Sequence, residues 1–331
     1  MVDLVLMNNA RNLSNNPPVT VIISTRNRAE SLLRTLESIF TLNYPDFCLI
    51  VLDQSDEKLP QDALAKFDAT GKFCYVYSST RGLGAGHNAA IALAKTELIA
   101  VTDDDCITPP GWLDEMVQAF KQDEKIGLVF GNVLPTAYDP DTGYIPVFEG
   151  ATPTPTLLKG VSDRLIAGLG IGACLGLKRS AWLAAEGFDE MLGPGAPLGS
   201  LEDRDFAIRL LLREYYIYHA PDFSVEHFGY RKNAKLKKLA YRDWFGFGTS
   251  FAKFLKCGDL ALMPYMLGQM WFGQAVKPFF KHLLFKRRVR GVTPIWSFWV
   301  GFVVGVFARV DRPTRKFKVS KRQHPVSQIN C

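Results

Sequence analysis

The sequence predicts an α/β fold built on a largely parallel sheet. Short runs of β-branched and aliphatic residues, typical of strands buried on both faces, recur along the first hundred residues. Segments with the apolar spacing of amphipathic helices separate these runs. Strands that alternate with helices in this way favour parallel pairing, because each helix returns the chain to the same edge of the sheet.

The first half of the predicted sheet is read directly from this alternation. Residues 19–23 are a continuous β-branched run, and the helical stripe that comes after it places Leu32, Leu36 and Ile39 on one face. The predicted strands are 19–23, 48–52, 73–77 and 98–101, and the predicted helices are 29–40 and 83–94. Ligands of such sheets bind beyond the carboxyl ends of the strands, so we expect a site at that edge.

The middle of the chain is less regular. Residues 138–156 are rich in Pro, Gly and Thr and are predicted to form a loop over the sheet. A small, apolar segment at 168–177 predicts another strand, and 181–186 a short helix. The glycine-rich segment 193–199 predicts a loop before a helix at 206–213.

Asp103, Asp104 and Asp105 come directly after the last of the first four predicted strands. Carboxylates this close raise one another's pKa unless a cation or strong hydrogen-bond donors compensate them. A hard divalent ion such as Mg²⁺ or Mn²⁺ would compensate them and could also hold phosphate. The cluster is therefore the first candidate for the working centre, and a solvated acidic turn is the alternative.

The net charge of +6 is unevenly divided along the 331 residues. Residues 1–227 hold 18 Lys and Arg against 30 Asp and Glu, whereas residues 228–331 hold 21 against 3. A basic tail behind an acidic body suggests an anionic partner, either phospholipid or nucleic acid. The hydrophobic fraction of 47% is that of a globular chain and excludes a disordered one.

The six cysteines are scattered, with neither Cys-x-x-Cys pairs nor zinc-site spacing. We expect small buried thiols in a reducing compartment. The amino terminus lacks the pattern of a secretory signal. The sequence therefore predicts that the catalytic body stays in the cytoplasm.

Two apolar, aromatic segments, 260–280 and 295–308, lie in the basic tail. The second has 14 residues, fewer than the ~20 needed to cross a bilayer. A spanning hairpin would also carry the basic segment 286–290 to the far side. We therefore expect helices that lie in the interface at the inner face of the cell membrane, bound to anionic lipid. Helices packed on the catalytic core are the alternative, and nucleic acid is disfavoured because the aromatic residues form long apolar runs.

Five motifs along the chain carry a resemblance to a known family. They are Val-Ile-Ile-Ser-Thr-Arg-Asn-Arg at 21–28, Val-Leu-Asp-Gln-Ser-Asp at 51–56, the acidic strand end with its Pro and Trp at 102–113, Gly-Phe-Asp-Glu at 187–190, and Glu-Asp-x-Asp at 202–205. In this order they resemble the family 2 glycosyltransferases of the GT-A fold. The resemblance implies a GT-A catalytic domain over 1–229. The basic, aromatic composition of 230–331 separately predicts a helical, membrane-associating tail.

The resemblance also implies a reaction. A sugar would pass from a nucleotide-diphosphate sugar, UDP-sugar by default, to a hydroxyl of a lipid-linked or polysaccharide acceptor, with inversion at the anomeric carbon. Asp203 would be the general base, with Glu202 beside it. Asp103, Asp105 and His227 would hold Mn²⁺ or Mg²⁺. The residues implied for the nucleotide-sugar are Thr25, Arg26, Asp53, Arg81, Asp103 and Asp104.

Several of these residues also have plain structural explanations. Asp53 could cap the turn after its strand, and Glu202 and Asp203 could complement the dipole of a first helical turn. Arg209, which the resemblance also places in the acceptor-side segment, could contact substrate or anchor its helix by a salt bridge. His87 stands where many relatives carry Arg, which puts a phosphate contact there in doubt.

Two other functions compete with glycosyl transfer. A sugar nucleotidyltransferase needs a glycine-rich loop for triphosphate near the amino terminus, and residues 24–28 lack glycine. A non-catalytic membrane-associated scaffold of the same fold would not need the intact acidic cluster or the Glu-Asp pair.

Overall fold

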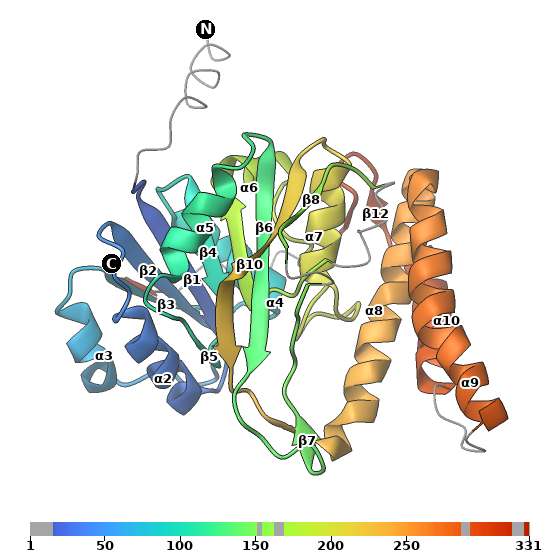
Figure 1. The fold of residues 1–331 in the computed structure, drawn as a ribbon, viewed down its shortest axis with the longest axis horizontal. Helices are drawn as coiled ribbons and strands as arrows, with labels where there is room; N and C mark the ends of the chain where they lie inside the picture. The colour runs from blue at the N-terminus through green and yellow to red at the C-terminus, as the bar shows by residue number, and fades with distance from the viewer. Residues whose placement is uncertain (1–15, 151–153, 162–168, 286–291, 320–327, 331) are drawn as a thin grey trace, which may run out of the picture.

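The computed structural model describes residues 16–150, 154–161, 169–285, 292–319 and 328–330 (Figure 1). One twisted sheet runs through the body, with helices on both of its faces. The α/β class with a mostly parallel central sheet is confirmed. The basic segment 286–290, on which part of the membrane prediction rests, lies outside the described residues.

The main sheet has the strand order β14-β3-β2-β1-β4-β9-β6-β10-β5. The neighbouring strands β3, β2, β1 and β4 pair in parallel. Strand β9 is antiparallel to both of its neighbours, β4 and β6. Strands β6 and β10, which pair in parallel, therefore run in the same direction as β1. The strands are β1 (Val19–Thr25), β2 (Phe47–Asp53), β3 (Phe73–Tyr77), β4 (Leu98–Thr102), β5 (Cys106–Ile107), β6 (Ile126–Pro135), β8 (Thr156–Leu158), β9 (Cys174–Lys178), β10 (Tyr216–His227) and β14 (Gln328–Asn330).

The first four strands and two helices lie where the sequence predicts them. The strand predicted over 168–177 instead begins at Cys174, and residues 169–173 form a loop before it. The long strands β6 and β10 were not predicted.

Alternation along the strands builds two cores, one on each face of the sheet. On β1, Ile22 faces one core, whereas Val21 and Ile23 face the other. The helices α2 (Ala29–Ile39), α3 (Gln61–Asp68) and α5 (Trp112–Phe120) cover one face; α4 (Leu83–Leu93), α6 (Arg179–Ala184) and α7 (Glu202–Leu211) cover the other.

The carboxyl ends of the parallel strands meet at one edge, which places the polar motifs together. Thr25 at the end of β1 is in register with Asp53 at the end of β2. His227, the last residue of β10, pairs with Cys106 on the short strand β5, directly after the three aspartates. Residues far apart in sequence therefore converge on one rim.

The basic tail folds as helices against the body. It contains α8 (Leu236–Cys257), a 3₁₀ turn η3 (Leu260–Leu262), the π-helical segment η4 (Pro264–Val276), α9 (Lys277–Phe285) and α10 (Val292–Phe307). Figure 1 shows α8 and α10 side by side at one end of the molecule. Phe247, Phe251, Phe254 and Phe298 join the core that also holds α7. Part of the tail's aromatic surface is thus core packing, the alternative that the sequence left open.

Glycines set the distance between α8 and α10. A Cβ on Gly248 would lie 2.0 Å from the Phe298 carbonyl oxygen, and one on Gly301 would lie 2.1 Å from that of Phe245. Only glycine lets the two backbones approach this closely. Within the described residues, no helix combines the length and apolar character that crossing a bilayer requires.

One cysteine departs from the prediction of unpaired thiols. Cys74, on β3, is disulfide-bonded, so the prediction is wrong for this residue. Cys48, Cys106, Cys174 and Cys257 are free, and Cys106 and Cys174 are buried as expected.

Candidate active site

Two of the three clustered aspartates are paired with groups of this chain. Arg28, in the turn after β1, donates to Asp104 Oδ1 at 2.9 Å and to Asp105 Oδ2 at 2.7 Å. Thr25 Oγ1 donates to Asp104 Oδ2 at 2.6 Å. Burial raises the pKa of Asp104 even though Arg28 opposes the shift. A guanidinium therefore supplies part of the compensation that the sequence predicted from a divalent ion, and Arg28 was missed.

His227 holds the other oxygen of Asp105. Its Nε2 lies 2.9 Å from Asp105 Oδ1, and its Nδ1 lies 2.9 Å from the Pro146 carbonyl oxygen. Burial alone would raise the pKa of Asp105, but His227 and Arg28 outweigh it and lower that pKa. Asp105 in turn raises the pKa of His227 against the effect of burial. The structure thus places His227 directly against the acidic cluster, and its role as a metal ligand stays a prediction.

Asp103 differs from its two neighbours. Among the described residues, no side chain donates a hydrogen bond to its carboxylate, which lines a cavity in the body. Burial and the nearby charge of Asp105 raise the pKa of Asp103 to about 7. A carboxylate in this setting is stabilised by any cation that enters the cavity.

The donor set at this rim suits a hard divalent ion. Carboxylate oxygens and an imidazole are ligands that Mn²⁺ and Mg²⁺ accept. Asp105, Cys106 and His227 place their ligand atoms within 4.8 Å of one another. Burial and two nearby aspartates raise the pKa of the Cys106 thiol well above its usual range, which disfavours it as a ligand. A Cβ on Gly229 would lie 2.1 Å from Asp105 Oδ2, so glycine is needed where the chain passes the cluster.

The central cavity, of about 420 Å³, joins this rim to the amino-terminal end of α7. Asp103 and His227 line one side of it, and Glu202 and Asp203 another. Residues 170–173 and the loop before α7 form part of the remaining wall, and the basic tail forms another part. These tail residues are Arg231, Leu239, Arg242, Asp243, Trp244, Phe247 and Gln274.

The Glu-Asp pair opens α7 after a left-handed residue, Leu201, with φ of 88°. Asp203 Oδ2 accepts the Gly172 amide at 2.8 Å, and Oδ1 accepts the Arg204 amide at 2.6 Å. Burial raises the pKa of Asp203 although Arg204 and these bonds oppose it. Burial, and after it repulsion from Asp203, raises the pKa of Glu202 to about 8. Burial therefore favours the protonated form of both carboxyl groups, and the charge of Asp203 further disfavours ionisation of Glu202.

A second cavity, also of about 420 Å³, lies between the ends of β1 and β2. Thr25, Arg28 and Asp53 line it. Asp53 is fully buried, accepts the Ser55 amide at 2.8 Å and accepts the Tyr75 hydroxyl. The turn-capping explanation of Asp53 is therefore present, while the residue still faces a cavity.

The two predicted arginines of the donor site lie at the outer edge of this cavity. Arg26 and Arg81 each form an ion pair with Asp56, at 3.3 and 3.2 Å. Asp56 lines the cavity and is itself exposed. The structure thus brings Thr25, Asp53 and the two arginines to the same edge of the sheet.

His87 and Arg209, also considered from the sequence, line neither of these two cavities. His87 is buried against Ser24, with Nδ1 3.0 Å from Oγ, which removes it from phosphate binding. Arg209 is fully buried and donates to Asp205 Oδ2 at 2.8 Å, so the salt-bridge explanation holds. Arg231, Arg242 and Trp244 were missed, because nothing in a basic, aromatic tail marks which side chains turn toward the body.

The fold is that of the GT-A glycosyltransferases, as comparison with solved structures shows. The mannosyltransferase PcManGT from Pyrobaculum calidifontis, solved in complex with GDP-Man and Mn²⁺, superposes with a TM-score of 0.59 at 16% identity. The match covers 88% of this chain and 87% of that one. At this identity the likeness establishes the fold.

Residues 20–181 match the model of glycosyl transferase family 2, which confirms the resemblance carried by the motifs. An uncharacterized glycosyltransferase of Nostoc sp. is 26% identical over 113 residues, which are 34% of this chain and 35% of the relative. Succinoglycan biosynthesis protein ExoU of Rhizobium meliloti is 29% identical over 221 residues, which are 62% of this chain and 61% of the relative. The chain therefore spans about a third of the first relative and less than two thirds of the second.

Proposed function

We propose that this protein is an inverting, metal-dependent glycosyltransferase. It moves a sugar from a nucleotide-diphosphate sugar to a hydroxyl of a lipid-linked or polysaccharide acceptor. The observation that carries the proposal is the central cavity, where Asp103 and His227 face Glu202 and Asp203. A metal-binding rim and a buried base across one cavity are the two parts that such a displacement requires.

The donor side uses the edge of the sheet. Asp53 and Thr25, which line the cavity between β1 and β2, bind the nucleotide base and ribose. Asp104, which accepts a hydrogen bond from Thr25, belongs to the same site. Arg26 and Arg81 bind the diphosphate when their ion pairs with Asp56 are replaced by ion pairs with phosphate oxygens. Asp103, Asp105 and His227 hold Mn²⁺ or Mg²⁺, which supplies positive charge to the leaving nucleoside diphosphate.

The acceptor side uses α7. Asp203 takes the proton of the acceptor hydroxyl while the hydroxyl oxygen forms a bond to the anomeric carbon. The bond between that carbon and the diphosphate oxygen breaks on the opposite side. The nucleoside diphosphate leaves with the electron pair, so the configuration inverts. The backbone amides of Gly172 and Arg204 donate hydrogen bonds to the Asp203 carboxylate and so orient this general base. Glu202, with a pKa of about 8, stays neutral and donates a hydrogen bond to bound sugar.

UDP is the donor nucleotide we propose first, and the PcManGT complex with GDP-Man makes GDP the competitor to test beside it. We also propose that the tail keeps the enzyme at the inner face of the membrane, where a lipid-linked acceptor is found. Trp296 and Phe307 on α10 are 65% and 82% exposed. Residues 260–310 contain no Asp or Glu, so this apolar surface meets an anionic bilayer without repulsion.

The test begins with the donor. UDP-, GDP- and dTDP-sugars are screened by thermal shift with and without Mn²⁺, and we expect one nucleotide to stabilise the protein only when the metal is present. Transfer of the identified sugar is then measured for Asp203→Asn, with Asp68→Asn on the exposed end of α3 as a matched control. We expect kcat to fall by at least about 100-fold in Asp203→Asn, with donor binding retained. Turnover equal to that of the control would reject Asp203 as the base.

A further inference from the structure

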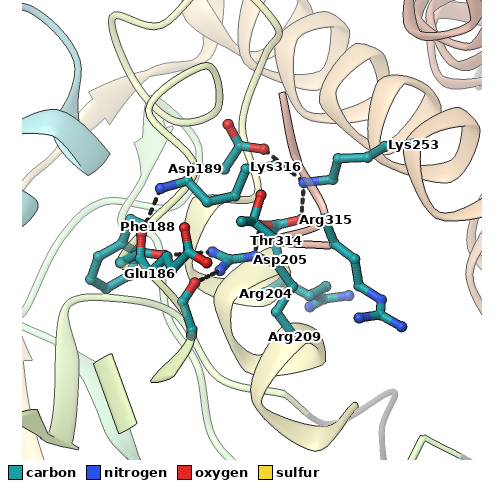
Figure 2. A network of polar contacts seen from close by, with 12 residues as sticks. Glu186, Phe188, Asp189, Arg204, Asp205, Arg209, Lys253, Thr314, Arg315 and Lys316 are labelled. Atoms are coloured by element: carbon teal, nitrogen blue, oxygen red, sulfur yellow. Dashed lines mark hydrogen bonds and ion pairs between the residues drawn. The ribbon is translucent and has the colours of Figure 1, made fainter. Parts of the chain in front are cut away.

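The structure contains a fully buried cation that no step above uses. Lys253, on α8, has zero exposure. Its Nζ lies 2.8 Å from Asp189 Oδ2 and also contacts Asp205 Oδ1 (Figure 2). A buried ammonium is strongly unfavourable unless it is paired and hydrogen-bonded, so this group is held in one arrangement.

The two carboxylates come from the segments that build the acceptor side. Asp205 lies in the first turn of α7, two residues after Asp203, and also accepts Arg209 Nε at 2.8 Å. Arg209 in turn donates to the carbonyl oxygens of Ala185 and Gly187 at 2.6 and 2.8 Å. Figure 2 shows Asp205 between the lysine of α8 and the arginine of its own helix.

Asp189 connects this cluster to a further strand. Its Oδ1 accepts the Met191 amide at 3.1 Å, and its Oδ2 accepts the Phe317 amide at 2.9 Å. Phe317 belongs to β13 (Lys316–Phe317), which pairs with β12 (Val310–Asp311) after α10. Lys253 thus links the Gly-Phe-Asp-Glu segment, α7 and the end of the tail.

Two more residues of α8 hold the loop that leads into α7. The Ser200 hydroxyl donates to Asp243 Oδ1 at 2.6 Å, and the Thr249 hydroxyl donates to the Leu198 carbonyl oxygen at 2.9 Å. A Cβ on Gly246 would lie 2.4 Å from the Ser200 carbonyl oxygen, so the loop lies directly on the helix backbone. Asp243, Thr249 and Lys253 therefore hold residues 198–205 at three successive points along α8.

Side chains two apart on a helix point to opposite sides. Asp205 therefore faces α8, while Asp203 faces the central cavity. The contact of Lys253 with Asp205 thus fixes the backbone turn that also carries Asp203. We propose that Lys253 is a positioning residue for the catalytic base, through which the tail sets the geometry of the acceptor site. The inference rests on the proposed role of Asp203.

The decisive experiment separates position from stability. Lys253→Met removes the ammonium and leaves Asp189 buried without a cation, so this variant can fail to fold. The double variant Asp189→Asn/Lys253→Met removes one charge of each sign, and Asp205 keeps Arg209. We expect the double variant to melt within a few degrees of the wild type, with kcat lowered at least tenfold and the donor KM changed less than twofold.

The matched control lies one turn further along α8. Lys256 Nζ donates to the carbonyl oxygens of Val306 and Ala308 at 2.8 and 2.6 Å, which ties α8 to the end of α10 and leaves α7 untouched. We expect Lys256→Met to keep the wild-type kcat. Full kcat in the folded double variant would overturn the proposal, as would a donor KM that rises in step with the loss of kcat. Absence of transfer by the wild type would instead count against the proposed function.

Discussion

Arg28 and Lys253 show how this chain balances buried acids one residue at a time. Each cation contacts two carboxylates, and all four acids lie in motifs that the sequence analysis singled out. The acidic residues could be predicted because three carboxylates in a row are conspicuous after an apolar strand. Their cationic partners could not be, because Arg28 lies about 76 residues before the cluster and Lys253 is one of many basic residues in the tail.

His87 gives a pH dependence that belongs to the fold and not to the reaction. Burial lowers the pKa of His87 from 6.5 to about 4. Between these two pH values the unfolded chain binds a proton that the folded chain refuses, so stability falls as the pH falls. The loss amounts to about 1.4 kcal/mol per pH unit, or roughly 3 kcal/mol in all.

The measurement is chemical denaturation of the wild type and of His87→Gln between pH 6.5 and 4. We expect the unfolding free energy of the wild type to fall by roughly 3 kcal/mol over this pH interval. We expect His87→Gln not to show this decrease. Identical acid slopes in the two proteins would contradict a neutral, buried His87.

Elements were predictable where one periodicity dominates. The strands β1 to β4 are continuous apolar runs, buried on both faces, and α2 carries a clear stripe, so each lies at its predicted position. The strand β10 was missed because it contains Pro221 and Asp222 at an irregularity in its pairing with β6. The antiparallel direction of β9 was likewise not predicted, since direction depends on where the connecting segments run.

The α8–α10 pair gives a prediction at this scale. Gly301→Ala adds a Cβ that would lie 2.1 Å from the Phe245 carbonyl oxygen, so the helices have to separate. We expect a loss of about 1–3 kcal/mol in unfolding free energy, as for other overpacked contacts. Gly268→Ala in η4 meets no atom within 4 Å and serves as the control. Equal stability of the two variants in thermal or urea unfolding would refute close backbone packing.

The whole molecule has an acidic body and a basic helical tail. The domain boundary between residues 229 and 230 stays a prediction. The tail is not a simple appendage, because its inner aromatic side chains complete a core shared with α7. Its outer side chains, such as Trp296 and Phe307, remain exposed, and lipid contact by this outer face stays a prediction. Periodicity alone could not separate these faces, since α10 is apolar nearly all round.

Vesicle flotation tests the outer face. We expect the protein to float with phosphatidylglycerol vesicles and less with pure phosphatidylcholine, and Trp296→Ser/Phe307→Ser to weaken binding by roughly tenfold or more. Leu183→Ser on α6, at 52% exposure, removes an exposed apolar side chain elsewhere and should leave flotation unchanged. Binding that the α10 variant retains in full would exclude this face as the lipid contact.

The charge cluster around Lys253 has a consequence for exchanging parts between relatives. A chimera that joins this catalytic body to the helices of another glycosyltransferase would leave Asp189 and Asp205 without their ammonium unless the graft brings one to the same turn. Specificity swaps in this chain should therefore keep 236–257 and β13 with the body, because the Phe317 amide also bonds Asp189.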